Sequence, residues 1–144
     1  MSTLTNFDIQ RYVDQTNLSN FRGVFMRDTL PSRGPRQCEC GIVNLNTSRQ
    51  PGSHWVCYFK DKSDRIYFDS FGQITPIEIQ KYLKTEHEFD KKICVIQRNT
   101  DTVQSINSSV CGHLCLTVLD ALTRGLSFQQ TINILRRRFE DGRS

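Results

Sequence analysis

The chain has 144 residues, of which 37% are hydrophobic and 24% are charged, and its formal net charge is +4. A chain of this length and composition forms one globular domain with its own core, so we expect a single domain over residues 1–144 and exclude a disordered or fibrous protein. No stretch is apolar enough to span a membrane, and the N-terminus lacks the basic and apolar parts of a secretory signal. We therefore expect an intracellular protein with no membrane partner.

The six cysteines are expected to be reduced thiols, because an intracellular protein rarely forms disulfides. Cys38 and Cys40 are spaced too tightly for the usual zinc knuckle, and no C-x-x-C pair occurs in the chain. A scattered site formed by these two with Cys111, His113 and Cys115 is an alternative that the sequence leaves open. We expect no metal and no cofactor.

The N-terminal third of the chain predicts a helix, a loop and a strand. Apolar residues recur at helical spacing over Asn6–Leu18, with Asn6 as the cap. Two prolines and a glycine break any regular element in the stretch Asn17–Arg36, which we expect to be a loop. A strand over Gly41–Asn46 and a turn over Thr47–Ser53 follow.

The middle of the chain predicts a hairpin and a short helix. Trp55–Phe59 is continuously apolar, as in a strand covered on both faces, and Arg65–Asp69 returns beside it as the second strand of the hairpin. Thr75 and Pro76 open a helix with an acidic first turn. A charged loop over Glu86–Lys92 and a short buried strand over Ile93–Ile96 complete this part.

The stretch Gln104–Cys115 leads into an apolar helix. Residues 107–109 are Asn-Ser-Ser, all good cap residues, and leucine and valine recur at helical spacing behind them. Cys111 is therefore expected near the N-terminus of a buried helix. Gly125 ends this helix, and Ser127 caps a last helix.

The place of Cys111 suits a nucleophile. Unpaired amide N–H groups and the positive end of the helix dipole favour a thiolate over a thiol, and the thiolate is the nucleophilic form. The same N–H groups can bind an oxyanion. The alternative is that Cys111 is only a small buried residue at a helix start.

Three further residues supply what a thiol protease needs, namely a base, a group that orients the base, and an oxyanion donor. His54 stands at the entry of the apolar strand, and Asp69 ends its hairpin partner, so the hairpin places the carboxylate near the imidazole. Gln104, seven positions before Cys111, can turn its amide toward the oxyanion. A strand-edge histidine, a turn aspartate and a loop glutamine are the plain alternatives.

Two other histidines compete with His54 as the base. His87 lies between two glutamates in a charged loop, where a solvated histidine is expected. His113 lies two residues after Cys111, about 200° around the helix axis, so its ring should point away from the thiol. His54 is therefore the preferred base.

These residues stand in three motifs: Gly-Ser-His-Trp at 52–55, Phe-Asp-Ser-Phe-Gly at 68–72, and Gln-Ser-Ile-Asn-Ser at 104–108 leading to Cys-Gly at 111–112. Together the motifs closely resemble the adenovirus protease (adenain) family of cysteine peptidases. The resemblance extends from about Phe7 to Phe128. A more distant similarity is to the Ulp-type SUMO-deconjugating proteases, which use the same order of histidine, acid, glutamine and cysteine.

The resemblance implies a fold and a role for each residue. His54 corresponds to the general base, Asp69 to its orienting acid, Gln104 to the oxyanion donor and Cys111 to the nucleophile. The implied fold is α+β, the papain-like or adenain-like cysteine protease fold, with a central mixed β-sheet flanked by helices and the nucleophile at a helix N-terminus. The implied activity is cleavage of viral or virus-like-element precursor polypeptides after a small residue such as Gly.

The resemblance also implies partners and a location. Adenovirus enzymes are helped by a viral peptide linked through a cysteine and by DNA, and Cys94 lies in a similar region here. A viral source would place the protein in the host nucleus or cytoplasm and in the virion. A cluster of arginines near the C-terminus is either a solvated helix end or a nucleic-acid contact. The cluster consists of Arg136, Arg137, Arg138 and Arg143.

Two other functions remain open. The first is a deconjugating protease that acts on a ubiquitin-like Gly-Gly tail. The second is a binding module that kept the fold and recognises extended peptides or capsid proteins without cleaving them. Intact His54, Asp69, Gln104 and Cys111 argue against a purely binding protein, which has no need of all four.

Overall fold

The computed structural model describes residues 5–46, 54–62, 64–84, 95–103 and 111–141. The helices are α1 (Asn6–Thr16), α2 (Ile77–Lys84), α4 (Cys111–Thr123) and α5 (Phe128–Asp141), and the strands are β1 (Phe21–Met26), β2 (Cys38–Asn44), β3 (Trp55–Asp61), β4 (Asp64–Phe68) and β5 (Gln97–Arg98). Several predicted features lie outside the described residues: the turn at 47–53, the loop at 86–92 with His87, Cys94, Gln104, the cap residues 107–109 and Arg143.

Within the described residues the strands form one five-stranded sheet in the order β1-β2-β3-β4-β5. The central strand β3 is antiparallel to both β2 and β4. At the two edges of the sheet, β1 pairs parallel with β2 and β5 pairs parallel with β4. The β3–β4 pair is the predicted hairpin, with Lys62 in the left-handed region at its turn (φ 53°). The predicted mixed sheet is confirmed.

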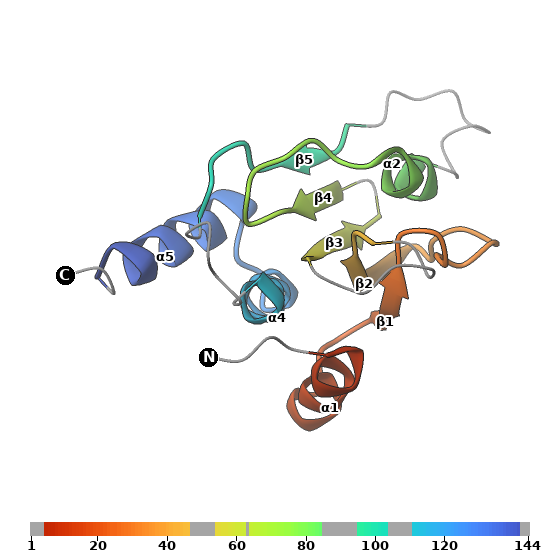
Figure 1. Ribbon diagram of the computed structural model, residues 1–144, viewed down its shortest axis with the longest axis horizontal. Helices are drawn as coiled ribbons and strands as arrows, with labels where there is room; N and C mark the ends of the chain where they lie inside the picture. The colour runs from red at the N-terminus through yellow and green to blue at the C-terminus, as the bar shows by residue number, and fades with distance from the viewer. Residues whose placement is uncertain (1–4, 47–53, 63, 85–94, 104–110, 142–144) are drawn as a thin grey trace.

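Helices cover both faces of this sheet (Figure 1). Residues of α1, α4 and α5 pack with β2, β3 and β4 in one apolar cluster, and α4 is the helix most extensively packed on β3. On the other face, α2 packs against a second cluster that includes Val43, Val56 and Tyr67. The predicted α+β fold is therefore confirmed as three layers. No helix in the described part of the chain is long and apolar enough to cross a membrane.

β1 lies in the stretch Asn17–Arg36, which the sequence predicted to be a loop, so that prediction was wrong. Val24 pairs with Ile42 of β2, and Phe21 and Val24 pack on the α4-side core while staying partly exposed. The strand contains Arg22 and Gly23 and shows no clean alternation of apolar and polar residues. Its hydrogen bonds to β2 create the strand, and this pairing is not visible in the local pattern.

β5 is displaced from the predicted buried strand at Ile93–Ile96. The strand consists of Gln97 and Arg98, both exposed, and Val95 is 68% exposed. It forms because these two residues pair parallel with Ile66 and Tyr67 of β4. Ile93 and Cys94 lie outside the described residues, and for Val95 the prediction of burial was wrong.

The ends of the helices follow from local hydrogen bonds. Thr5, not Asn6, caps α1, because the Thr5 hydroxyl accepts the Asp8 N–H while the Asp8 carboxylate accepts the Thr5 N–H. Gly125 ends α4 in the left-handed region (φ 97°), as predicted. The predicted Ser127 cap of α5 is also present, with its hydroxyl accepting an N–H three residues on.

Candidate active site

The hairpin brings His54 and Asp69 together. His54 directly precedes β3, and its backbone C=O accepts the Leu45 N–H at 2.9 Å, which fixes the start of β3 against the end of β2. Asp69 directly follows β4, the antiparallel partner of β3. His54 Nε2 therefore lies 2.7 Å from Asp69 Oδ1, although the two residues are 15 positions apart.

The Asp69 carboxylate lies in hydrogen-bond contact with the imidazole of His54. Asp69 is 1% exposed, and its Oδ1 also accepts the Phe71 N–H at 2.9 Å, which holds the carboxylate in place. An ionised carboxylate only accepts hydrogen bonds, so Nε2 carries the proton at this contact and Nδ1 is the nitrogen left for other chemistry. The Phe71 ring stacks on the imidazole, with centroids 4.7 Å apart and planes inclined by 27°.

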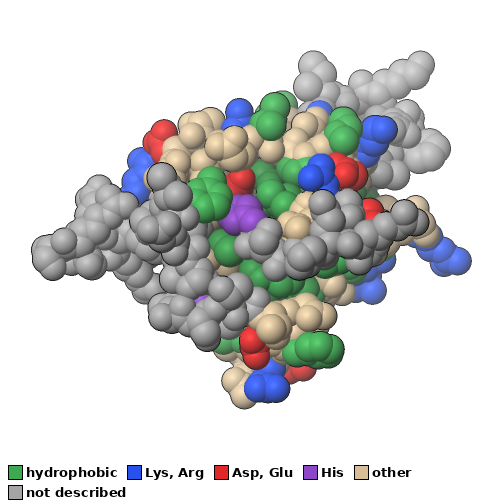
Figure 2. All heavy atoms as spheres, in the orientation of Figure 1, with side chains coloured by type: hydrophobic (Ala, Val, Ile, Leu, Met, Phe, Trp, Pro, Cys, Tyr) green, Lys and Arg blue, Asp and Glu red, His purple; other side chains and the backbone are tan. Residues whose placement is uncertain are grey.

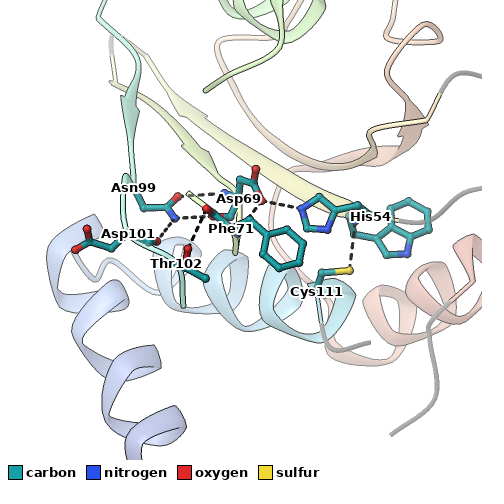
Figure 3. Close-up of polar contacts among 8 residues, drawn as sticks. His54, Asp69, Phe71, Asn99, Asp101, Thr102 and Cys111 are labelled. Atoms are coloured by element: carbon teal, nitrogen blue, oxygen red, sulfur yellow. Dashed lines mark hydrogen bonds and ion pairs between the residues drawn. The ribbon is translucent and has the colours of Figure 1, made fainter. Parts of the chain in front are cut away.

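Cys111 lies on the other side of the imidazole. It is the first residue of α4, and its Sγ accepts the Trp55 N–H at 3.4 Å. Trp55 follows His54 in the chain, so the start of β3 supplies both the ring and an N–H donor to one thiol. Figure 3 shows the His54 ring between the Asp69 carboxylate and the Cys111 side chain.

The electrostatics favour an imidazolium and a thiolate. Burial lowers the pKa of His54, but its hydrogen bonds to Asp69 and to the Cys111 thiolate raise it more, to about 9. Burial raises the pKa of Cys111, but the hydrogen bond with His54, the Trp55 N–H, the charge on His54 and the Gly112 N–H outweigh burial and lower it. A thiolate at neutral pH is the reactive form of cysteine.

Other cysteines in the described part of the chain have no such surroundings. Burial raises the pKa of the Cys40 thiol to about 12, and burial with a hydrogen bond to Cys57 raises that of Cys115. Cys38 donates a hydrogen bond to Asp61. Among the described residues no group of three or more His, Cys, Asp or Glu side chains is arranged to hold a metal ion.

Of the two rival histidines, the structure describes His113. His113 makes no hydrogen bond to Cys111 within the described residues, and its buried Nε2 has no hydrogen-bond partner there. His87 lies outside the described residues, as do Gln104 and Cys94. The structure therefore brings together His54, Asp69 and Cys111 and does not describe the fourth predicted residue.

The arginine cluster is partly accounted for by structure. Arg136 on α5 forms an ion pair with Asp101, in the segment that follows β5. Arg137 is exposed, and the side chains of Arg138 and Arg143 lie outside the described residues. At least one member of the cluster thus serves an internal contact.

Three contributors to this site were not predicted from the sequence. The Trp55 N–H carries no sequence signal because every non-proline residue has one. Phe71 stood in the Ser-Phe-Gly turn, and its aromatic ring so close to the acid was a usable signal. Asn99, which contacts the Asp69 backbone, stood in a polar stretch without any signal.

The site is open to solvent at the imidazole. The His54 side chain is 16% exposed, and Figure 2 shows histidine atoms at the surface of the face in view.

Known proteins are similar to this chain in sequence. The sequence model of the adenovirus endoprotease family matches residues 21–135. The protease of porcine adenovirus A serotype 3 is 25% identical over 131 residues, which cover 83% of this chain and 64% of that protease. The protease of human adenovirus A serotype 12 is 32% identical over 114 residues, which cover 72% and 52%. The chain thus spans less than two thirds of the length of these relatives.

A solved structure shares the fold. The crystal structure of the ASFV pS273R protease superimposes with a TM-score of 0.57 and 17% sequence identity, covering 96% of this chain and 66% of that one. At this identity the likeness concerns the fold alone.

Proposed function

Because this chain belongs to the adenovirus endoprotease family, we propose that it is a cysteine endopeptidase. The observation that supports this most is the position of His54, with Asp69 at 2.7 Å on one side and a thiol of lowered pKa on the other. A protein that only binds peptides has no use for a stabilised thiolate. The proposed roles are those that the sequence analysis assigned to His54, Asp69, Gln104 and Cys111.

In the first half of the proposed reaction, the Cys111 thiolate attacks the carbonyl carbon of the scissile peptide bond. A C–S bond forms and the carbonyl electrons move to the oxygen. The His54 imidazolium then gives its Nδ1 proton to the amide nitrogen as the C–N bond breaks, and the new amine leaves. Asp69 keeps the proton on Nε2 throughout and stabilises the imidazolium.

In the second half, neutral His54 takes a proton from water at Nδ1, and the hydroxide attacks the thioester carbon. The C–S bond breaks, which regenerates the Cys111 thiolate and the imidazolium and releases the carboxylic acid. The oxyanion formed in each half needs preorganised donors. We assign these to the backbone N–H of Cys111, at the helix start, and to the side-chain amide of Gln104.

The proposed substrates are precursor polypeptides of a virus or virus-like element, cut after a small residue such as Gly. Family membership supports this choice. An activating peptide or DNA, a role for Cys94 in binding such a peptide, and a location in the host nucleus or cytoplasm and the virion all stay predictions. That residues 1–144 act as a single domain is likewise a prediction.

Labelling with an electrophilic peptide tests the proposal. We expect a peptide aldehyde or vinyl sulfone that ends in Gly to modify the 144-residue chain on Cys111, and a fluorogenic peptide with Gly before the scissile bond to be cleaved. Cys111→Ala serves as the control, because it removes the nucleophile and should abolish both reactions without loss of folding. Modification of another cysteine, or no cleavage by a well-folded chain with or without added peptide and DNA, would refute the proposal. Cleavage of a ubiquitin-like Gly-Gly tail but of no precursor peptide would reassign the substrate.

A further inference from the structure

Asn99 is a buried carboxamide that bonds both backbone polar groups of Asp69. Its Oδ1 accepts the Asp69 N–H at 3.1 Å, and its Nδ2 donates to the Asp69 C=O at 2.6 Å (Figure 3). The residue is only 7% exposed. It follows β5 directly, just as Asp69 follows β4, so the side-chain amide continues the parallel pairing of these two strands beyond their last backbone pair.

The segment that begins at Asn99 runs along the turn that begins at Asp69. The Thr102 hydroxyl donates to the Phe71 C=O at 3.2 Å, and the Val103 N–H donates to the Ser70 C=O at 2.8 Å. Gly72 approaches this segment so closely that a Cβ there would lie 2.6 Å from a backbone oxygen. Asn99 is the member of the segment whose side chain bonds the acid residue itself.

The position of the Asp69 backbone matters because the carboxylate has only two side-chain torsions. Its distance from His54 Nε2 depends on where the Cα lies, and Asp69 stands outside the hydrogen-bonded ladder of β4. A misplacement of about 1 Å in a catalytic arrangement can cost on the order of a hundredfold in rate. A carboxamide suits this position because it offers a donor and an acceptor in one plane.

We propose that Asn99 is a positioning residue, whose carboxamide holds the Asp69 backbone so that the Asp69 carboxylate meets the imidazole of His54. This inference rests on the proposed function of the His54, Asp69 and Cys111 site. Asn99 acts through Asp69 and does not touch the reacting atoms. Its loss should therefore weaken the hold of Asp69 on the imidazolium, and with it the stabilisation of the Cys111 thiolate.

The test compares Asn99→Leu with a matched control, Gln80→Leu. Leucine is close to asparagine in size but bonds neither backbone group. Gln80 is also a carboxamide that donates to a backbone carbonyl, that of Thr75 at 2.7 Å, but it lies on α2, which packs on the other face of the sheet. Three quantities are measured for each variant: kcat and KM on a Gly-containing peptide, the pH dependence of Cys111 alkylation by iodoacetamide, and the melting temperature.

We expect Asn99→Leu to lower kcat about tenfold to a hundredfold with KM within about threefold. The acid limb of the alkylation profile should move up by about one pH unit, because a His54 imidazolium that Asp69 holds less firmly stabilises the Cys111 thiolate less. Gln80→Leu should lower the melting temperature and change neither kcat nor the profile. If Asn99→Leu does not fold, Asn99→Ser decides the matter, because its hydroxyl can still bond one of the two groups and should give a smaller change in the same direction.

Two results would overturn the inference. One is a folded Asn99 variant with the kcat and alkylation profile of the wild type. The other is a loss of melting temperature and activity together with an unchanged alkylation profile, which would mean a structural role only. The alkylation profile needs no substrate, so it still decides the role of Asn99 if the wild-type chain cleaves no peptide and the proposed function fails.

Discussion

Among the described residues, Glu39 and Asp69 carry buried carboxylates, and the surroundings of the two differ. Glu39 on β2 is 1% exposed, and each of its oxygens accepts two hydrogen bonds. The donors are the Arg22 guanidinium, the Arg36 N–H and the hydroxyls of Tyr58 and Tyr82. Asp69 is equally buried, but its Oδ1 accepts from one backbone N–H and from the His54 ring.

The two carboxylates differ in whether their hydrogen-bond partners titrate. The two tyrosine hydroxyls that donate to Glu39 keep their protons at neutral pH, because burial, and then the hydrogen bond to Glu39, raises the pKa of both tyrosines. This network ties α2 to the sheet. The partner of Asp69 is the His54 imidazole, which loses its proton as pH passes about 9. The proposal that Asp69 is the orienting acid therefore depends on its titrating partner and not on burial alone, because Glu39 is equally buried.

Asp69→Asn and Glu39→Gln should show the largest and most different effects. Asp69→Asn should lower turnover on the order of a hundredfold or more with little loss of stability, because an amide cannot hold the imidazolium. Glu39→Gln should cost about 3 kcal/mol of unfolding free energy, because it breaks a buried charged network. Steady-state kinetics measure the turnover of both variants, and chemical denaturation measures their unfolding free energies. Full activity of a well-folded Asp69→Asn protein would show that Asp69 is not the orienting acid.

Gln104→Ala tests the proposed oxyanion donor. An oxyanion donor acts as charge develops in the transition state, so turnover should fall about tenfold to a thousandfold, or about 1.4 to 4 kcal/mol, with little change in KM or melting temperature. Gln104→Glu should be at least as damaging, because a carboxylate offers no N–H. A residue that only holds the chain would show the opposite pattern, a lower melting temperature with no rate defect.

The titration of the site gives a third test. Cys111 should lose its proton below the ordinary cysteine pKa of 9.0, and His54 should keep its proton up to about 9. The value of kcat/KM should therefore rise as Cys111 ionises and fall as pH passes about 9. Iodoacetamide at neutral pH should modify Cys111 faster than Cys38, which is the more exposed of the two. Mass spectrometry at timed intervals decides the order, and an earlier reaction at Cys38 would contradict it.

The same shift predicts a dependence of stability on pH. Because the folded pKa of His54 is raised from 6.5 to about 9, its contribution to stability is fully present below pH 6.5 and is lost as pH rises through about 9. Asp69→Asn should bring this pKa back toward 6.5 and weaken the dependence. NMR titration of the His54 ring in both proteins measures the effect directly.

The smallest expected effect is that of Tyr82→Phe. It removes one of the donors to Glu39 and leaves the aromatic ring in place, so unfolding free energy should fall by about 1 kcal/mol. Turnover and the alkylation profile of Cys111 should not change, because the Glu39 network does not reach the imidazole. A clear loss of kcat in this variant would mean that the two regions are coupled.

Some of this structure was predictable because it depends on short-range interactions. Gly125 and Ser127 mark helix ends through bonds within a few residues, and the β3–β4 hairpin joins neighbouring segments. The apolar spacing behind Cys111 predicted the helix α4, whereas the predicted cap residues 107–109 lie outside the described residues. The pairing of His54 with Asp69 in turn follows from the hairpin, since both residues stand at the same end of its two strands.

Sequence by itself thus determined the helix carrying Cys111, the hairpin, and the family to which the chain belongs. Tertiary structure alone decided that β1 is a strand, that β5 lies at Gln97–Arg98, and that Asn99 bonds the backbone of Asp69 from 30 residues away. The spacing of apolar residues and the presence of cap residues depend on interactions within one element, so both can be recognised in the sequence. Parallel pairing and a side chain bonded to a distant backbone exist only once the partner segment is in place, because no local preference encodes them.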